Sequence, residues 1–288
     1  IVGFFLGRIK PLTSEKISKS LIRFGIPISI VGLLLKAGIN IDLVNSAVLA
    51  FITIVFFIVC INQISPLKNI FPNYSSQLAG LIGNTSFLGI PIAIALLPTD
   101  TINLTIGYDL GTTMFSWIFG PYFLQHSNSN YSFLNFRKLL FSIFSSPASK
   151  GIIGALIIYL LGLENVMEDL LWLPARIVIY LAIIVVGSRL GIITNGKKII
   201  FHLKERIKFI LLLKLFLLPL FIYIVCQILN FKKVDTIALV LQAGTPSAIS
   251  TILMAEAYKV KRELAAKALF ITTIFSTVTI PLIFLLLN

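Results

Sequence analysis

The chain has 288 residues, of which 57% are hydrophobic and only 12% are charged. Soluble domains carry about 25% charged residues, so this composition excludes a soluble globular protein, a disordered chain and a secreted disulfide scaffold. It indicates an all-α polytopic membrane protein in a lipid bilayer. The net charge is +13, which we interpret as marking cytoplasmic loops and not nucleic-acid binding.

The apolar runs predict the spans. The first run, 1–9, is too short for a bilayer, which needs about 20 residues, so we interpret it as a truncated first helix. Nine further runs follow, bounded by polar or Pro/Gly breaks: 21–38, 44–65, 74–98, 101–124, 150–163, 170–190, 207–229, 235–258 and 264–287. The Ser/Asn-rich linker 125–149 divides them into two five-helix halves, 1–124 and 150–288.

The distribution of Lys and Arg predicts the orientation. If the amino terminus is outside, 20 of the 24 basic residues lie in cytoplasmic connections, at 8–23, 65–73, 125–150, 189–214 and 259–267. This positive-inside pattern places both termini outside, the mid-chain linker in the cytoplasm and the protein in the inner (plasma) membrane. Two halves of five helices each must then lie upside down relative to one another, as in the inverted repeats of secondary transporters.

The fourth span of each half is interrupted by small and helix-breaking residues. The interruptions read Gly83-Asn84-Thr85-Ser86-Phe87-Leu88-Gly89-Ile90-Pro91 and Gln242-Ala243-Gly244-Thr245-Pro246-Ser247-Ala248. Gly83 and Gly244 each lie nine residues into their span, which is about 13 Å at 1.5 Å per residue, close to the middle of the bilayer. Since the two spans enter from opposite faces, both breaks are predicted to converge at one depth.

A helix break at this depth is tolerated only where protein or a water-filled cavity surrounds it. The half-helix that restarts after a break presents free N–H groups and a positive dipole end, which together favour an anion such as a carboxylate. The alternative is that the small residues serve helix contacts and that Pro91 and Pro246 are ordinary kinks. The occurrence of the feature in both halves favours a binding site, with side-chain donors and acceptors from Asn84, Thr85, Thr245 and Ser247.

The two motifs, with Ala255-Glu256-Ala257-Tyr258 after the second, resemble those of the auxin efflux carrier family of membrane transporters. The similarity extends over nearly the whole chain. It implies ten helices in two inverted repeats, with broken fourth and ninth helices that cross in a mobile unit. That unit would move against a scaffold, in an elevator-type carrier of small organic anions such as auxin, malate or malonate. The scaffold often mediates dimerisation, which leaves a homodimer open.

The resemblance also implies residue roles. Asn84 matches an asparagine that contacts the substrate carboxylate, and Pro246 matches the crossing proline of the second break. Gly83 stands where plant members have proline, and the span 44–65 lacks their ionisable pair, so a prokaryotic-type carrier is favoured over an auxin exporter. The expected substrate-binding residues are Gly83, Asn84, Thr85, Gly89, Pro91, Gln242, Gly244, Thr245, Pro246 and Ser247.

Three of the charged residues within the predicted spans need an explanation. Asp109 lies about 12 Å from the outer end of 101–124, where an unpaired carboxylate costs several kcal/mol. It is either an ion-coupling residue or a structural hydrogen-bonded carboxylate. Glu256, near the inner end of its span, either couples transport or forms an ion pair with Lys259. We interpret Lys214 as a lysine that snorkels to the inner interface.

Other functional classes remain to be weighed. Tyr108-Asp109 resembles a motif of intramembrane aspartyl proteases, but that chemistry needs a second Asp and no other Asp lies mid-span, so no enzyme is expected. A sodium-coupled bile-acid-type symporter shares the ten-helix plan, and a non-transporting sensor on the same scaffold stays open. The two histidines lie in polar connections, so we expect no metal site and no cofactor.

Overall fold

The computed structural model describes residues 2–125, 147–194, 205–257 and 262–288. Within these segments the regular structure is helical apart from one isolated β-bridge, which confirms the all-α prediction. Most of the predicted linker 125–149 lies outside the described residues.

The helices of the first half follow the predicted runs closely. The run 21–38 becomes a π-helical turn and one helix, and the run 74–98 becomes two helices separated by a break. The elements are α1 (Val2–Ile9), α2 (Pro11–Ser20), η1 (Leu21–Gly25), α3 (Ile26–Ala37), α4 (Ile41–Gln63), α5 (Ser65–Ile70), α6 (Tyr74–Leu81), η2 (Thr85–Gly89), α7 (Ile90–Leu96), η3 (Thr99–Thr101) and α8 (Ile102–Gln125).

The second half agrees equally well with the predicted runs, and the run 235–258 is again broken in two. Its elements are α10 (Pro147–Leu160), α11 (Glu164–Thr194), α12 (Glu205–Leu212), η4 (Leu213–Leu217), α13 (Leu218–Ile228), α14 (Lys233–Ala243), α15 (Ile249–Ala257) and α16 (Arg262–Leu287). Four stretches of the described chain are long and apolar enough to cross a membrane: Ile41–Gln63, Glu164–Ile192, Glu205–Ile228 and Glu263–Leu287.

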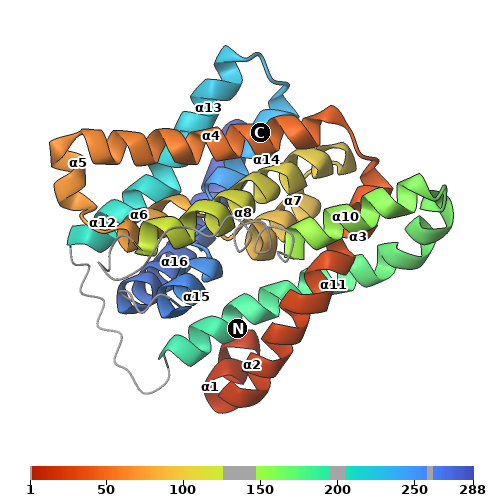
Figure 1. The fold of residues 1–288 in the computed structure, drawn as a ribbon, viewed down its shortest axis with the longest axis horizontal. Helices are drawn as coiled ribbons and strands as arrows, with labels where there is room; N and C mark the ends of the chain where they lie inside the picture. Colours follow the sequence, from red (N-terminus) through yellow and green to blue (C-terminus); the bar gives the residue numbers. More distant parts are fainter. Residues whose placement is uncertain (1, 126–146, 195–204, 258–261) are drawn as a thin grey trace.

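The helices pack in two groups (Figure 1). In the first group, α1, α2, α3 and α10 pack around the long helix α11. In the second group, α4 packs along α8, while α12 and α16 pack against α6, and α13 packs against α14. Contacts of α3 with α8, and of α11 with η2 and α7, join the groups. The broken helices therefore belong to the second group and border the first at η2 and α7.

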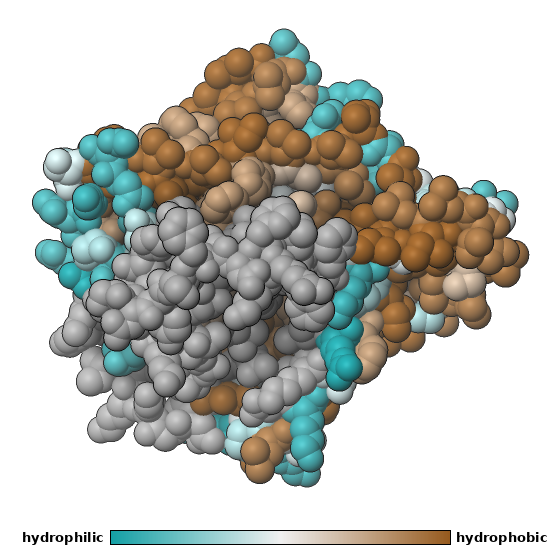
Figure 2. Space-filling model, viewed as in Figure 1, coloured by the Kyte–Doolittle hydropathy of each residue, from teal (hydrophilic) through white to brown (hydrophobic). Residues whose placement is uncertain are grey.

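Much of the described surface is apolar, while many serine and threonine side chains are buried in the interior. One face of α4 exposes Val44, Val48, Ile52, Phe56 and Val59 at helical spacing, while its buried residues include serine and threonine. Hydrophobic residues also cover much of the α10–α11 region at the right of Figure 2. Lipid tails, unlike water, stabilise such a surface, so the pattern is that of an integral membrane protein.

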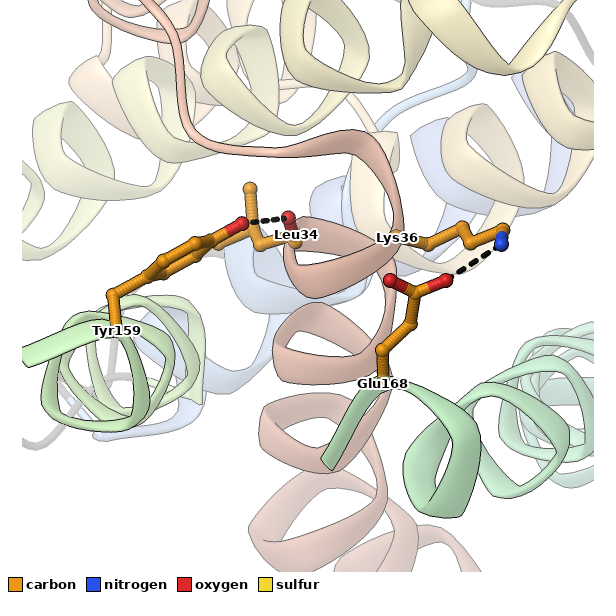
Figure 3. A network of polar contacts seen from close by, with 4 residues as sticks. All are labelled: Leu34, Lys36, Tyr159 and Glu168. Carbon is orange, nitrogen blue, oxygen red and sulfur yellow. Dashed lines mark hydrogen bonds and ion pairs between the residues drawn. The ribbon is translucent and has the colours of Figure 1, made fainter. Parts of the chain in front are cut away.

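Polar contacts hold the end of α3 between its two neighbours (Figure 3). The hydroxyl of Tyr159 on α10 donates to the carbonyl of Leu34 at 3.4 Å, and Lys36 pairs with Glu168 of α11 at 2.6 Å. Trp172 lies beside the same lysine, with the Lys36 Nζ 6.0 Å from its ring centroid. These contacts tie α3, α10 and α11 into one unit.

Candidate functional site

The two breaks lie directly against one another. Gly83 and Ser247 form an antiparallel bridge. The backbone N–H of Asn84 donates to the carbonyl of Pro246 at 2.7 Å, and the N–H of Ala248 donates to the carbonyl of Ile82 at 3.0 Å. Each break therefore satisfies backbone groups that the other has freed, which is how a membrane interior tolerates non-helical backbone. The predicted convergence of the two breaks is confirmed.

Two hydroxyl side chains of the second break stabilise the crossing. The Ser247 hydroxyl donates to the carbonyl of Ala79 in α6 at 2.6 Å, and its backbone N–H donates to the Thr272 hydroxyl of α16 at 3.0 Å. The Thr245 hydroxyl donates to the carbonyl of Gln242 at 2.7 Å. Both side chains are fully buried. Their hydroxyl hydrogens are thus already committed to backbone carbonyls, which the sequence did not reveal.

Other polar atoms at the crossing have no hydrogen-bond partner within the described part of the chain. They are the Asn84 side-chain nitrogen, both amide atoms of Gln242 and the Oδ2 of Asp109. A buried polar group without a partner costs about 1–3 kcal/mol, and such groups in native proteins commonly contact water or a ligand. Three residues with this property around one pair of helix breaks mark the crossing as the candidate site.

Asp109, which belongs to α8, contacts the start of the half-helix that follows the first break. Its Oδ1 accepts hydrogen bonds from the Thr85 hydroxyl at 2.5 Å and the Ser86 hydroxyl at 2.6 Å. The Thr85 hydroxyl is also 3.2 Å from that of Thr112. These hydrogen bonds are compatible with both predicted alternatives, a structural carboxylate and an ion-coupling residue. They also connect Asp109 to the crossing through Thr85.

Removing the Asp109 acceptor is expected to destabilise the protein. In Asp109→Leu, the buried hydroxyl of Thr85 and the half-buried hydroxyl of Ser86 lose a shared acceptor, at a cost of about 1–3 kcal/mol for a buried group left unpaired. In Asp109→Asn a carbonyl oxygen remains to accept them, so the thermal denaturation midpoint should fall much less. Midpoints of the purified proteins in detergent test this, and equal midpoints for the two variants would contradict it.

Lys214 of η4 is the residue that sequence reasoning placed wrongly. It is 2% exposed, and its Nζ donates to the carbonyl of Ala243, at the end of α14, at 2.6 Å. The snorkelling interpretation is therefore wrong, because the side chain points to the crossing and not to the interface. A signal was present in the sequence, since Lys214 falls on the helical stripe of buried apolar residues formed by Ile207, Ile210, Leu218 and Ile222.

The predicted glycines have different neighbours. A Cβ on Gly83 would lie 2.9 Å from the Lys214 Nζ and would clash with the Thr245 hydroxyl oxygen, so the crossing requires glycine there. A Cβ on Gly89 would lie 2.8 Å from the side-chain amide carbon of Gln242, so the amide packs directly on η2. Gly244 ends α14 and faces the Ile283 side chain of α16.

The crossing brings together most of the predicted site residues. Pro91 is buried in α7, six residues after the half-helix begins at Thr85, and does not lie at the break itself. The Glu256 side chain lies outside the described part of the structure, as does Lys259. The predicted residues that lie at or against the paired breaks are Gly83, Asn84, Thr85, Gly89, Gln242, Thr245, Pro246 and Ser247.

Paired helix breaks in a lipid-facing helical protein are typical of membrane transporters. A family model described as "membrane transport protein" matches residues 1–284. The chain belongs to this family, and the resemblance to auxin efflux carriers is confirmed. It is also 23% identical over 221 residues to an uncharacterized transporter of Methanocaldococcus jannaschii, a match that covers 75% of this chain and 70% of that protein. The protein is thus a membrane transporter and not an enzyme.

Proposed function

We propose that the protein is a secondary carrier of small organic anions that binds its substrate at the crossing of the two broken helices. The observation that carries this proposal is the buried Asn84 amide nitrogen, which has no partner in the described chain and lies beside the break. A side-chain N–H₂ group has two hydrogens to donate. A substrate carboxylate supplies the missing acceptors.

The charges around the crossing support an anionic substrate. The half-helix η2–α7 begins at Thr85, so its positive dipole end points toward the break. The Lys214 ammonium lies against Gly83 of the same break. A carboxylate placed at Asn84 is therefore close to a helix amino terminus and a positive side chain. The Gln242 amide, also unpartnered among described residues, offers a second group for substrate contact.

The division of the helices into two groups supports an elevator-type motion. The group around α11 is held together by its own contacts and serves as the scaffold in this proposal. The group that holds both breaks moves against it and carries the substrate across the bilayer. The proposed arrangement is ten spans in two inverted repeats, 1–124 and 150–288, with both termini outside the plasma membrane and the linker in the cytoplasm. A homodimer through the scaffold is compatible with this arrangement.

The proposed direction is efflux. The export of one negative charge from a cell with a negative interior is favourable by about 2.3 kcal/mol per 100 mV. No coupled ion is needed for that direction. Asp109 and Glu256 remain the residues through which a proton gradient would act, and Asp109 is the better placed because it contacts Thr85 at the break.

The test is uptake of radiolabelled anions into proteoliposomes that contain the full-length protein. Malate, malonate and indole-3-acetate serve as probes, each with and without a pH or sodium gradient. We expect saturable flux of at least one of them. If folded protein transports none of the three under any gradient, the proposed substrate class is wrong.

A further inference from the structure

The environment of Lys214 is unusual for a lysine inside a membrane protein. Its side chain is 2% exposed, and its Nζ has one hydrogen-bond acceptor among the described residues, the carbonyl oxygen of Ala243 at 2.6 Å. The two ion pairs found in the described chain involve other lysines, Lys36 and Lys267. A buried charge without a counter-charge is costly, so this position calls for an anionic partner or a special function.

The acceptor that Lys214 contacts belongs to a helix break. Ala243 is the last residue of α14, and Gly244 follows it outside the helix. The carbonyl groups at a helix carboxyl end lack intrahelical partners and form the negative end of the helix dipole. In transporters with discontinuous helices, such carbonyls and half-helix ends coordinate the coupling Na⁺. The ammonium of Lys214 therefore bonds to the kind of group that would otherwise bind a sodium ion.

The same ammonium also lies against the first break. A Cβ added to Gly83 would be 2.9 Å from the Lys214 Nζ and 3.2 Å from its Cε. The charge is thus placed between the end of α14 and the backbone that pairs with Ser247. An ammonium group has three donors, and the carbonyl of Ala243 takes one of them. Asn84, whose side-chain nitrogen has no partner among the described residues, directly follows Gly83 in the chain.

The shape of helix 205–228 explains how a lysine reaches this position. The π-helical turn η4, Leu213–Leu217, interrupts the α-helix at Lys214. Such a turn inserts one extra residue into the helix and is found frequently at functional sites. Lys214 and its neighbours Leu213 and Leu215 are buried, while Phe216 and Leu217 face outward. Lys214 therefore lies in the π-helical turn, on the buried side of the helix.

We propose that Lys214 is a built-in cation that takes the place of a coupling sodium ion at the crossing. Its ammonium occupies the cation position at the end of α14 and supplies the positive charge that the substrate anion requires. Transport by the site is then independent of sodium. This last consequence rests on the proposed carrier function, whereas the occupation of the cation position can be measured without any transport.

The first measurement is the thermal denaturation midpoint of the full-length protein in detergent, in NaCl and in choline chloride at equal ionic strength. The wild-type midpoint is expected to be the same in both salts. In Lys214→Ala the carbonyl of Ala243 loses its partner and space opens beside it, so Na⁺ should raise the midpoint by at least about 2 °C, as a ligand that binds only the folded state does. The matched control is Lys208→Ala, which removes an exposed lysine six residues earlier and should respond equally to both salts.

Selective stabilisation of the wild type by Na⁺ would overturn the proposal, because the cation position would then be vacant or elsewhere. A Lys214→Ala protein that is stable and indifferent to Na⁺ would also overturn it. If Lys214→Ala does not fold, malate uptake by the wild type in sodium-free choline buffer decides, and a strict requirement for sodium refutes the inference. The two proposals can fail separately. If flux requires sodium, the cation assignment is wrong but the protein is still an anion carrier. If the thermal midpoints respond to the salts as expected but no tested anion is transported, the cation assignment stands and the anion-carrier proposal is wrong.

Discussion

Replacement of Asn84 by alanine is expected to reduce anion flux by at least about tenfold while leaving the protein folded. A hydrogen bond to a charged group contributes about 1.5–3 kcal/mol, which corresponds to a factor of ten or more. The backbone N–H of Asn84 makes the crossing bond to Pro246 and is retained in the variant. The side-chain nitrogen has no protein partner in the described chain, so its removal leaves no acceptor of another residue unsatisfied.

The matched control for this variant is Asn62→Ala. The Asn62 side chain donates to the carbonyl of Ile58 at 2.8 Å and exchanges hydrogen bonds with Gln77, so it is a structural asparagine away from the crossing. Its loss should lower the thermal midpoint but not the flux per folded molecule. Flux in proteoliposomes and midpoints in detergent separate the two effects. Wild-type flux in Asn84→Ala would disprove the crossing site.

Replacement of Gly83 by alanine is expected to disrupt the crossing itself and to lower both stability and flux. The new methyl group would overlap the Thr245 hydroxyl oxygen and would lie 2.9 Å from the Lys214 Nζ. Each of these groups is held by a hydrogen bond to a carbonyl of the second break, so neither can withdraw without losing it. Overpacking of this kind costs about 1–3 kcal/mol.

Gly80→Ala provides the control, one helical turn earlier in the same span. There a Cβ would meet only side-chain atoms, of which the Leu213 Cδ2 is nearest at 3.1 Å, and a leucine can adjust its rotamer. Alanine is also the better helix former by up to about 1 kcal/mol. We therefore expect Gly80→Ala to keep its thermal midpoint within a few degrees, and a Gly83→Ala protein of equal stability would show that the crossing is less tightly packed than the structure indicates.

Much of the fold was predictable because the governing interactions are local. Apolar run lengths located the helices, since a bilayer fixes how many residues a span needs. Gly83 and the Gly244–Pro246 segment located the two breaks, because glycine and proline destabilise a helix and here cluster close to mid-span. The expectation that the breaks would meet followed from equal depth and opposite entry. It required no knowledge of side-chain contacts.

The roles of individual polar side chains were less predictable. The hydroxyls of Thr245 and Ser247 looked equivalent to Asn84 as substrate donors in the sequence. Thr245 instead donates to the carbonyl of Gln242 three residues earlier, and Ser247 donates to the carbonyl of Ala79, which only the crossing brings near. Asp109 clearly required a partner at its depth, yet Thr85 and Ser86 are more than twenty residues away in the chain. Helix packing determines which residues so far apart in the chain become hydrogen-bond partners.

The sequence by itself therefore determined that this is a helical membrane transporter of the auxin efflux carrier type, where its helices lie and which two of them are broken. Only the tertiary structure decided that Lys214 enters the crossing, that Asp109 holds the start of the half-helix and that Asn84 and Gln242 keep unpartnered amide groups in the described chain. The physical reason is that hydropathy fixes the position of a residue along the membrane normal, whereas the rotation of each helix about its axis and the identity of its neighbours are set by packing.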